Sequence, residues 1–120
     1  MTKRLKIVIA DDEEDIRQGF RRLLCRLGCD VIGEASNGCE LVKLCQNNQP
    51  DLVITDIRMP MMSGLEAARK IAETQSIPVI VVSSYDCPAD EDCNSVADFL
   101  LKPVGLPDLE AAIAKACPPV

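Results

Sequence analysis

The chain has 120 residues, which fits one domain, and 48% of them are apolar, enough for a substantial core. The net charge of −6 argues against the basic surface that a nucleic-acid backbone requires, so we expect no direct nucleic-acid binding. The N-terminal apolar run is too short for a signal peptide or a membrane span. We therefore expect a single cytoplasmic domain over residues 1–120 that has no contact with a membrane.

Strand and helix patterns alternate along the chain, beginning with a continuous apolar run over residues 5–10 that is typical of a strand buried on both faces. Apolar residues then recur at helical spacing from Ile16 to Leu27, which predicts an amphipathic helix. Asp12 or a neighbour is expected to cap this helix, and Gly28 to end it. Its arginines are expected to form its solvated face: Arg17, Arg21, Arg22 and Arg26.

A weaker strand follows at residues 31–35, and its mixed polarity predicts the edge of a sheet. The later elements are expected in this order: a helix between 37 and 50, a strand at 51–55, a helix at 65–72, strands at 79–82 and 97–101, and a helix at 106–116. Residues 84–97 carry almost no apolar stripe, so a helix there is expected to be brief or replaced by a loop. This alternation predicts an α/β domain with a doubly wound parallel sheet, its first strand central and helices on both faces.

Polar residues follow each of the four strongly apolar strands. They are Asp11-Asp12, Asp56, Ser83-Ser84 and Lys102-Pro103. In an open parallel sheet, ligands bind at the carboxyl ends of the strands. Three carboxylates, a hydroxyl and an ammonium group gathered at that edge would hold a divalent metal ion and a phosphoryl group.

Each of these residues also has a simpler interpretation when it is taken alone. Asp11 and Asp12 would serve equally as a helix cap, and Asp56 as the start of a loop. Ser83 would serve as a turn former, and Lys102 as a solvated surface charge. However, all of these residues directly follow predicted strands, and this shared position favours one common site over separate local roles.

Five segments in one order match a known family: Ile9–Glu13, Asp51–Pro60, Met62–Gly64, Pro78–Ser83 and Ala97–Pro103. On these segments the chain resembles the response-regulator receiver domain of two-component signalling (the CheY-like superfamily) over nearly its whole length. The resemblance implies a flavodoxin-like fold with five parallel strands in the order 2-1-3-4-5. The chain is shorter than the usual receiver between Ser83 and Lys102, so the family's fourth helix is expected to be shortened or irregular here.

The resemblance also implies a role for each residue of the acidic group. Asp56 would be the phosphoacceptor. Asp12 and Asp56 would bind Mg²⁺ (or Mn²⁺) directly, and Asp11 would bind it mainly through a metal-bound water. The backbone carbonyl of Arg58 would complete the protein ligands.

The remaining matched positions would contact the phosphoryl group or respond to it. Ser83 and Lys102 would meet the phosphoryl oxygens, so these two residues and Asp56 would carry the chemistry. Ser83 and Phe99 match the two switch positions of the family. The bond between Lys102 and Pro103 tends to be cis in the family.

The implied function is that of a phosphoacceptor in a phosphorelay. A sensor histidine kinase or a phosphotransfer protein would donate the phosphoryl group, and a conformational change would carry the signal to a downstream protein target. The protein would be a monomer or a phosphorylation-dependent homodimer. We expect no effector domain after residue 117, and no enzymatic activity beyond self-catalysed phosphorylation and dephosphorylation.

Three other functions compete with this one. A receiver-like interaction module that is never phosphorylated would need a damaged acidic site, whereas all five key residues are present. A haloacid-dehalogenase-type phosphatase would need a second aspartate where Arg58 stands. A nucleotide-binding domain would need a glycine-rich loop where Asp11-Asp12-Glu13 stands.

The seven cysteines do not form a recognisable metal site, because the chain has no histidine and no CxxC spacing. We expect reduced thiols that serve as small apolar side chains. A redox-sensing pair at Cys25 and Cys29, one helical turn apart, is the alternative. The methionine cluster Met59-Pro60-Met61-Met62 is expected to pack within its loop.

Overall fold

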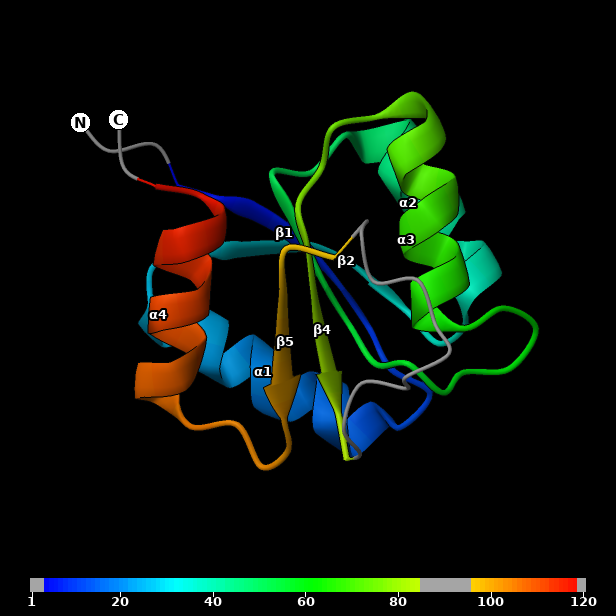
Figure 1. The fold of residues 1–120 in the computed structure, drawn as a ribbon. Coiled ribbons are helices and arrows are strands. Elements are labelled where there is room, and N and C mark those ends of the chain that lie inside the picture. Colours follow the sequence, from blue (N-terminus) through cyan, green and yellow to red (C-terminus); the bar gives the residue numbers. More distant parts are fainter. Residues whose placement is uncertain (1–3, 85–95, 119–120) are drawn as a thin grey trace.

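The computed structural model describes residues 4–84 and 96–118 of the chain (Figure 1). Its elements are β1 (Lys6–Ala10), α1 (Glu14–Arg26), β2 (Asp30–Ala35), α2 (Gly38–Asn48), β3 (Leu52–Thr55), α3 (Gly64–Thr74), β4 (Val79–Ser83), β5 (Asp98–Leu101) and α4 (Leu106–Ala116). These bounds confirm the predicted elements to within a few residues. Within the described ranges, no helix combines the length and apolar character needed to cross a bilayer.

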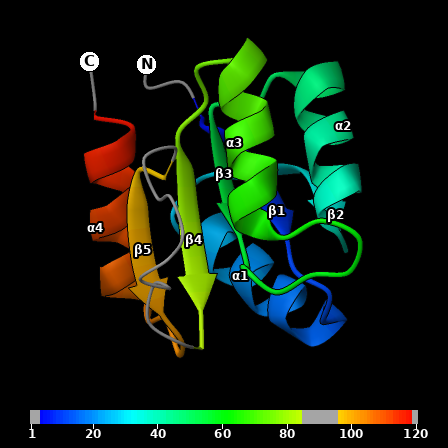
Figure 2. The same ribbon diagram turned by 45° about the vertical axis from the view of Figure 1, so that its right-hand side comes forward.

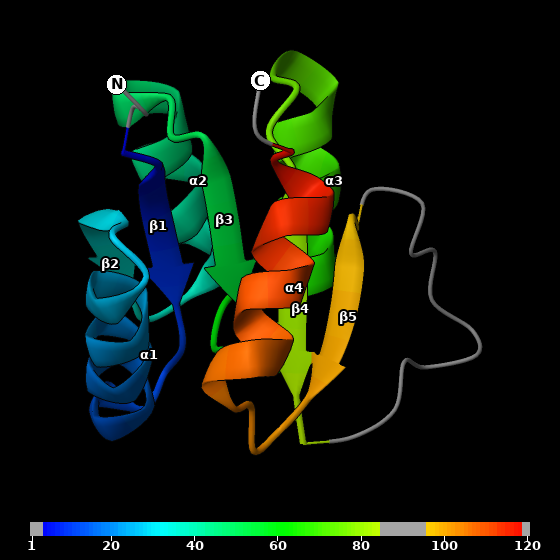
Figure 3. The same ribbon diagram turned by 90° about the vertical axis from the view of Figure 1, so that its left-hand side faces the viewer.

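The five strands form one parallel sheet in the order β2-β1-β3-β4-β5, which confirms the predicted flavodoxin-like topology. β2 lies at an edge, as its mixed polarity predicts. β1 is an interior strand, but β3 rather than β1 is the middle one, because both are buried and burial alone does not rank interior strands. The strand arrowheads point to one edge of the sheet, so the residues that follow the strands gather there (Figure 3).

Helices cover both faces of the sheet, α1 and α4 on one face and α2 and α3 on the other (Figures 2 and 3). The alternation of side chains along β1 divides the core accordingly. Ile7 and Ile9 pack with the α1 and α4 side, whereas Val8 and Ala10 pack with the α2 and α3 side. β1 is buried on both faces up to its last residue, so the residues that follow it lie at the sheet edge directly beside the core.

Short polar residues and a glycine define where the helices begin and end. The side chain of Asn37 accepts a hydrogen bond from the backbone N–H of Glu40 and caps α2, and Ser63 caps α3 through the N–H of Glu66. Gly28, with a φ of 80°, follows the last turn of α1 in a conformation that favours glycine. The end of α1 before Gly28 and the start of α2 after Asn37 confirm the boundaries predicted from the sequence, whereas the cap at Ser63 was not predicted.

The fourth helix of the family would fall between β4 and β5. The expectation that it is shortened or irregular concerns residues 86–96, nearly all of which lie outside the described residues. The chain returns to the sheet as β5, and the Lys102–Pro103 peptide bond beyond it is cis, as expected.

Candidate functional site

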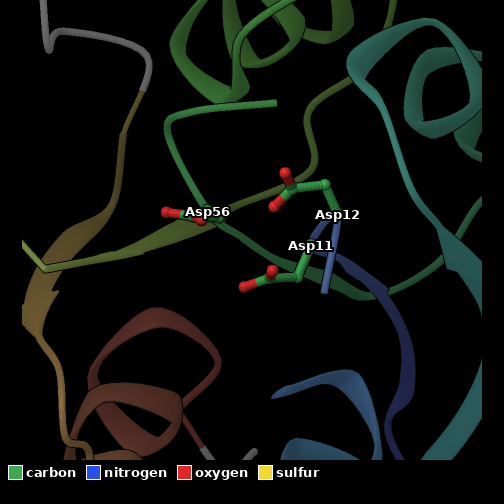
Figure 4. Close-up of side chains that lie close together, drawn as sticks. All are labelled: Asp11, Asp12 and Asp56. Atoms are coloured by element: carbon green, nitrogen blue, oxygen red, sulfur yellow. The ribbon is translucent and has the colours of Figure 1, made fainter. Parts of the chain in front are cut away.

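Three aspartate carboxylates meet at the carboxyl edge of the sheet. Asp11 and Asp12 directly follow β1, and Asp56 directly follows the neighbouring strand β3. One carboxylate oxygen from each of the three lies within 4.8 Å of the others, and Figure 4 shows the side chains turned toward a common space. The strand register explains this meeting, because Ala10 pairs with Thr55 and the next residues on both strands leave the sheet side by side.

Asp11 is the most firmly held member of the group. Its side chain is buried; Oδ1 accepts a hydrogen bond from the backbone N–H of Glu13 at 2.9 Å, and Oδ2 accepts one from Lys102 at 3.0 Å. Glu13 is the N-cap residue of α1 and makes no side-chain capping bond. The cap position therefore falls on Glu13, a neighbour of Asp12, in keeping with the expectation that Asp12 or a neighbour caps α1, and Asp11 accepts the hydrogen bond from the N–H of this cap residue.

Lys102 reaches across the sheet edge to two of the carboxylates. Its Nζ lies 3.0 Å from Asp11 Oδ2 and 3.5 Å from Asp56 Oδ2, and its side chain is 18% exposed. Such a residue is not a solvated surface charge. One ammonium group thus balances part of the charge of a three-carboxylate cluster, which leaves the cluster with excess negative charge.

Burial and charge oppose each other at Asp56. Burial raises the pKa of its carboxyl above the usual value, Lys102 lowers it, and the nearby charge of Asp11 raises it again, with a net increase. Burial alone would lower the pKa of Lys102, but its hydrogen bond and ion pair with Asp11, together with the charge of Asp56, raise it overall. The site therefore keeps a protonated lysine beside an Asp56 carboxyl that is harder to ionise than usual.

The backbone around Asp56 is held by its neighbours. The buried hydroxyl of Thr55 donates a hydrogen bond to the carbonyl oxygen of Asp56 at 2.9 Å, and Oδ1 of Asp56 accepts one from the N–H of Ile57 at 2.8 Å. Gly64 packs against the same carbonyl so closely that a Cβ atom placed there would lie 1.9 Å from the oxygen. A residue with any side chain at this position would push the loop after β3 away from the strand.

Asp12 differs from its two partners. Its side chain is exposed, and within the described part of the chain its carboxylate makes no hydrogen bond or ion pair. An unengaged carboxylate beside two engaged ones is chemically suited to a hard cation, because Mg²⁺ prefers oxygen ligands and keeps several waters. The donor set therefore fits a divalent metal ion.

Comparison with known proteins assigns the family. The response regulator receiver domain model matches residues 7–114. The chain belongs to the response-regulator receiver family. A receiver is the signalling module of a two-component response regulator, which confirms the family inferred from the five sequence segments.

Relatives share this receiver over most of its length. The transcriptional regulatory protein PdtaR of Mycobacterium tuberculosis is 35% identical over 115 residues, covering 92% of this chain and 56% of PdtaR. HptR, a transcriptional regulatory protein of Staphylococcus aureus, is 38% identical over 115 residues, covering 92% of this chain and 45% of HptR. The chain spans about half the length of these curated relatives, so only their receiver parts are compared.

A solved structure agrees with the fold. The response regulator domain of Thermotoga maritima CheB superimposes with a TM-score of 0.84 at 26% identity, covering 95% of this chain and 96% of that domain. This likeness in fold agrees with the family assignment.

The switch and phosphate-contacting candidates lie on β4 and β5 of the receiver. Ser83 is the buried last residue of β4, and its carbonyl accepts a hydrogen bond from the backbone N–H of Lys102 at 2.8 Å. Phe99 pairs with Val81 in the neighbouring strand and packs, half-buried, against the core on the α2 and α3 side. Ser83 therefore lies at the same sheet edge as the carboxylates, whereas the roles of Ser83 and Phe99 stay predictions.

The loop after β3 carries the other predicted ligand of the receiver. Arg58 is exposed and follows Asp56 by two residues, and the part played by its backbone carbonyl stays a prediction. Met59 and Met62 pack against the core on the α2 and α3 side, beyond the packing within the loop that was expected. Met61 does not, because it is 79% exposed with a φ of 70°.

Sequence reasoning missed Arg17, which it placed on the solvated face of the first helix. Its side chain is only 17% exposed, and Nη1 donates a hydrogen bond to the backbone carbonyl of Asp11 at 2.6 Å. Nε also pairs with Glu34 of β2 at 3.3 Å. Helical periodicity marks Arg17 as polar but does not say that the edge strand β2 lies beside it, so no local signal would have found it.

The cysteines of the described ranges differ in burial, and Cys117 is half-buried. Cys29 and Cys45 are buried, as expected of small apolar side chains, but Cys25 and Cys39 are exposed, contrary to that expectation. All four are free, so Cys25 and Cys29 are not joined. Burial raises the pKa of the Cys45 thiol to about 11.

Proposed function

We propose that this receiver accepts a phosphoryl group on Asp56 in the presence of Mg²⁺ (or Mn²⁺) and signals through a conformational change to a protein partner. The observation that carries the proposal is the placement of three carboxylates within 4.8 Å of one another, with the Lys102 ammonium group in contact with two of them. An inert module would gain nothing from this cluster, because clustered like charges cost stability.

The reaction transfers a phosphoryl group from a donor to a carboxylate oxygen of Asp56. A carboxylate oxygen of Asp56 forms a bond to phosphorus while the bond from phosphorus to the donor breaks. With acetyl phosphate the leaving group is acetate, and with a phosphorylated kinase it is the histidine nitrogen. Attack by water on the same phosphorus later returns Asp56 and inorganic phosphate.

Repulsion between an ionised Asp56 and an anionic donor must be cancelled for this attack to occur. Lys102 supplies one positive charge at the site. Asp12 and Asp56 would hold the divalent ion directly, Asp11 mainly through water, and the carbonyl of Arg58 would complete the set. The ion would supply the positive charge that the phosphoryl oxygens need in the transition state.

The signal would start from the atoms around the new phosphoryl group. Ser83 would donate a hydrogen bond to a phosphoryl oxygen, and Phe99 would turn inward as Ser83 moves. Such a change biases an existing two-state equilibrium through bonds that only the phosphorylated state makes. A beryllofluoride complex in which the Ser83 and Phe99 resonances keep their unliganded positions would contradict this part of the proposal.

The deciding experiment is intact-mass measurement after incubation with acetyl phosphate and Mg²⁺. We expect the mass of one phosphoryl group in the wild-type protein and none in Asp56→Asn. Chelation of the metal with EDTA should also prevent the gain. No gain and no metal binding would favour the unphosphorylated interaction module, whereas sustained turnover of a phosphate ester would favour a hydrolase.

The proposed donors are a sensor histidine kinase or a phosphotransfer protein, and the proposed target is a protein rather than nucleic acid or a membrane. The proposed donors would be supported if radiolabelled phosphate passes from a phosphorylated histidine protein to the wild-type chain but not to Asp56→Asn. Light scattering with and without beryllofluoride would separate a constant monomer from a phosphorylation-dependent homodimer.

A further inference from the structure

Arg17 is linked to the acidic group by a contact that the reaction described above does not use. It lies in the first turn of α1, and its guanidinium group has two partners on different elements. Nη1 donates to the backbone carbonyl of Asp11 at 2.6 Å, and Nε pairs with Oε1 of Glu34 at 3.3 Å. The planar fork of an arginine suits two simultaneous acceptors, whereas a lysine offers a single nitrogen.

Glu34 is itself fixed in place. Its other carboxylate oxygen, Oε2, pairs with Arg21, one helical turn after Arg17. Its side chain is 26% exposed, so the pair is partly shielded from solvent. Glu34 therefore holds the guanidinium group of Arg17 from the β2 side while that group holds the loop after β1.

The bond from Arg17 reaches the peptide that joins Asp11 to Asp12. This peptide is planar, so holding its carbonyl oxygen sets the direction of the next Cα atom. The N–H of Asp11 is also held, by the carbonyl of Ala35 at 3.0 Å. Both sides of Asp11 are thus fixed by groups on or attached to β2.

Asp12 depends on this backbone more than its partners do. Asp11 and Asp56 have side-chain hydrogen bonds of their own, but no such bond is made by the Asp12 carboxylate to any described residue. Its place in the cluster is therefore set by the backbone before it. We propose that Arg17, braced by Glu34, is a positioning residue that aims the Asp12 carboxylate at the metal site.

This inference rests on the proposed function, since it assumes that the acidic group binds a divalent ion. The first test measures the dissociation constant of Mg²⁺ for the unphosphorylated protein by calorimetry or by titration of amide resonances. For Arg17→Met we expect binding about tenfold weaker, the lower end of the range for residues that orient metal ligands. Arg22→Met is the matched control, because Arg22 is exposed on the same helix and the substitution removes the same charge.

Two further variants separate positioning from charge. Arg17→Lys keeps the charge but loses the fork, so we expect its Mg²⁺ affinity to stay reduced several-fold. Glu34→Gln removes the brace and should weaken binding in the same direction, and combining it with Arg17→Met should add little. If Arg17→Met does not fold, Arg17→Lys and Glu34→Gln decide the question by themselves.

The dependence of phosphorylation on metal gives a second readout. Acetyl phosphate should label Arg17→Met slowly at low Mg²⁺ and at nearly the wild-type rate once Mg²⁺ saturates the site. Arg17 variants that bind Mg²⁺ like Arg22→Met, or that stay slow at saturating Mg²⁺, would overturn the positioning role. A wild-type protein that binds no Mg²⁺ would instead overturn the proposed function.

Discussion

The ammonium nitrogen of Lys102 lies 3.0 Å from Oδ2 of Asp11, a residue 91 positions earlier in the chain. This contact joins the loop after β5 to the loop after β1, although β3 and β4 lie between these strands. It places one positive charge against two carboxylates in a partly buried site. The stability of the metal-free protein should therefore depend on this lysine.

We expect Lys102→Met to lower the free energy of unfolding of the metal-free protein by about 1–3 kcal/mol, because a buried carboxylate loses its charged partner. Urea unfolding in EDTA measures the change. Lys70→Met, on the exposed surface of α3, should change the free energy by less than about 0.5 kcal/mol. Added Mg²⁺ should recover part of the loss, because it binds the folded protein and replaces the missing charge. Equal stability of Lys102→Met and Lys70→Met would contradict this account.

Although Asp56 is paired with Lys102, its raised pKa predicts a pH dependence of stability opposite to that of a carboxylate whose pKa is lowered by its ion pair. Its pKa in the folded protein is raised, with burial as the main cause, above the ordinary value of 3.8. The folded protein therefore holds this proton more tightly, so the stabilising contribution is present below pH 3.8 and is lost as the pH rises through the folded pKa. At neutral pH, ionised Asp56 lowers the free energy of unfolding.

Asp56→Asn should accordingly be more stable than the wild-type protein at neutral pH without metal, by on the order of 1 kcal/mol. Thermal unfolding in EDTA at a series of pH values tests this. The advantage should shrink as the pH falls toward 3.8. Glu73→Gln removes an exposed carboxylate of α3 and controls for the change in net charge. A stability gain in Asp56→Asn that does not vary with pH would exclude the titration of Asp56 as its cause.

The sequence predicted the parts of this site that depend on local pattern. Apolar runs located the strands, and a polar residue after each run located Asp11, Asp12 and Asp56 at one sheet edge. These residues then lie together because a parallel sheet brings the carboxyl ends of its strands to one edge. The family resemblance, rather than the pattern, distinguished the roles of these carboxylates.

What the sequence did not predict depends on contacts between distant elements. The bond from Arg17 to the Asp11 carbonyl requires that β2 lie beside α1, and helical periodicity contains no such information. In the sequence, Gly64 likewise indicates only a loop. Its approach to the Asp56 carbonyl follows from the packing of α3 against β3. Both residues act on the backbone of a site residue, which is why side-chain chemistry did not reveal them.

Gly64 therefore gives a sharp test of the packing around Asp56. A Cβ atom at this position would lie 1.9 Å from the Asp56 carbonyl oxygen, so Gly64→Ala must displace backbone and should cost about 1–3 kcal/mol or more. Gly19→Ala is the matched control, because Gly19 lies in α1 with nothing within 4 Å of a new Cβ atom. Gly19→Ala should raise the free energy of unfolding by about 0.5–1 kcal/mol. Urea unfolding should therefore show changes in the free energy of unfolding of opposite sign for the two variants. A Gly64→Ala variant with unchanged stability would refute the close approach.

The cysteines of α2 predict a difference in thiol reactivity along one helix. Cys39 is exposed near the start of the helix, whereas Cys45 is buried near its end with a pKa raised to about 11. At pH 8, about one Cys45 thiol in a thousand would be ionised, and the thiolate is the reactive form. Iodoacetamide followed by peptide mapping should therefore label Cys39 quickly in the native protein.

Cys45 should react only after opening or unfolding, since it needs both solvent access and ionisation. Its labelling rate should rise sharply in urea above the unfolding midpoint, while that of Cys39 should change little. Lowering the free energy of unfolding with Lys102→Met should speed the labelling of Cys45 in the native protein and leave Cys39 unaffected, because only the buried thiol reports on opening. Equal native rates at the two cysteines would mean that the packing of α2 against the sheet is looser than its buried residues indicate.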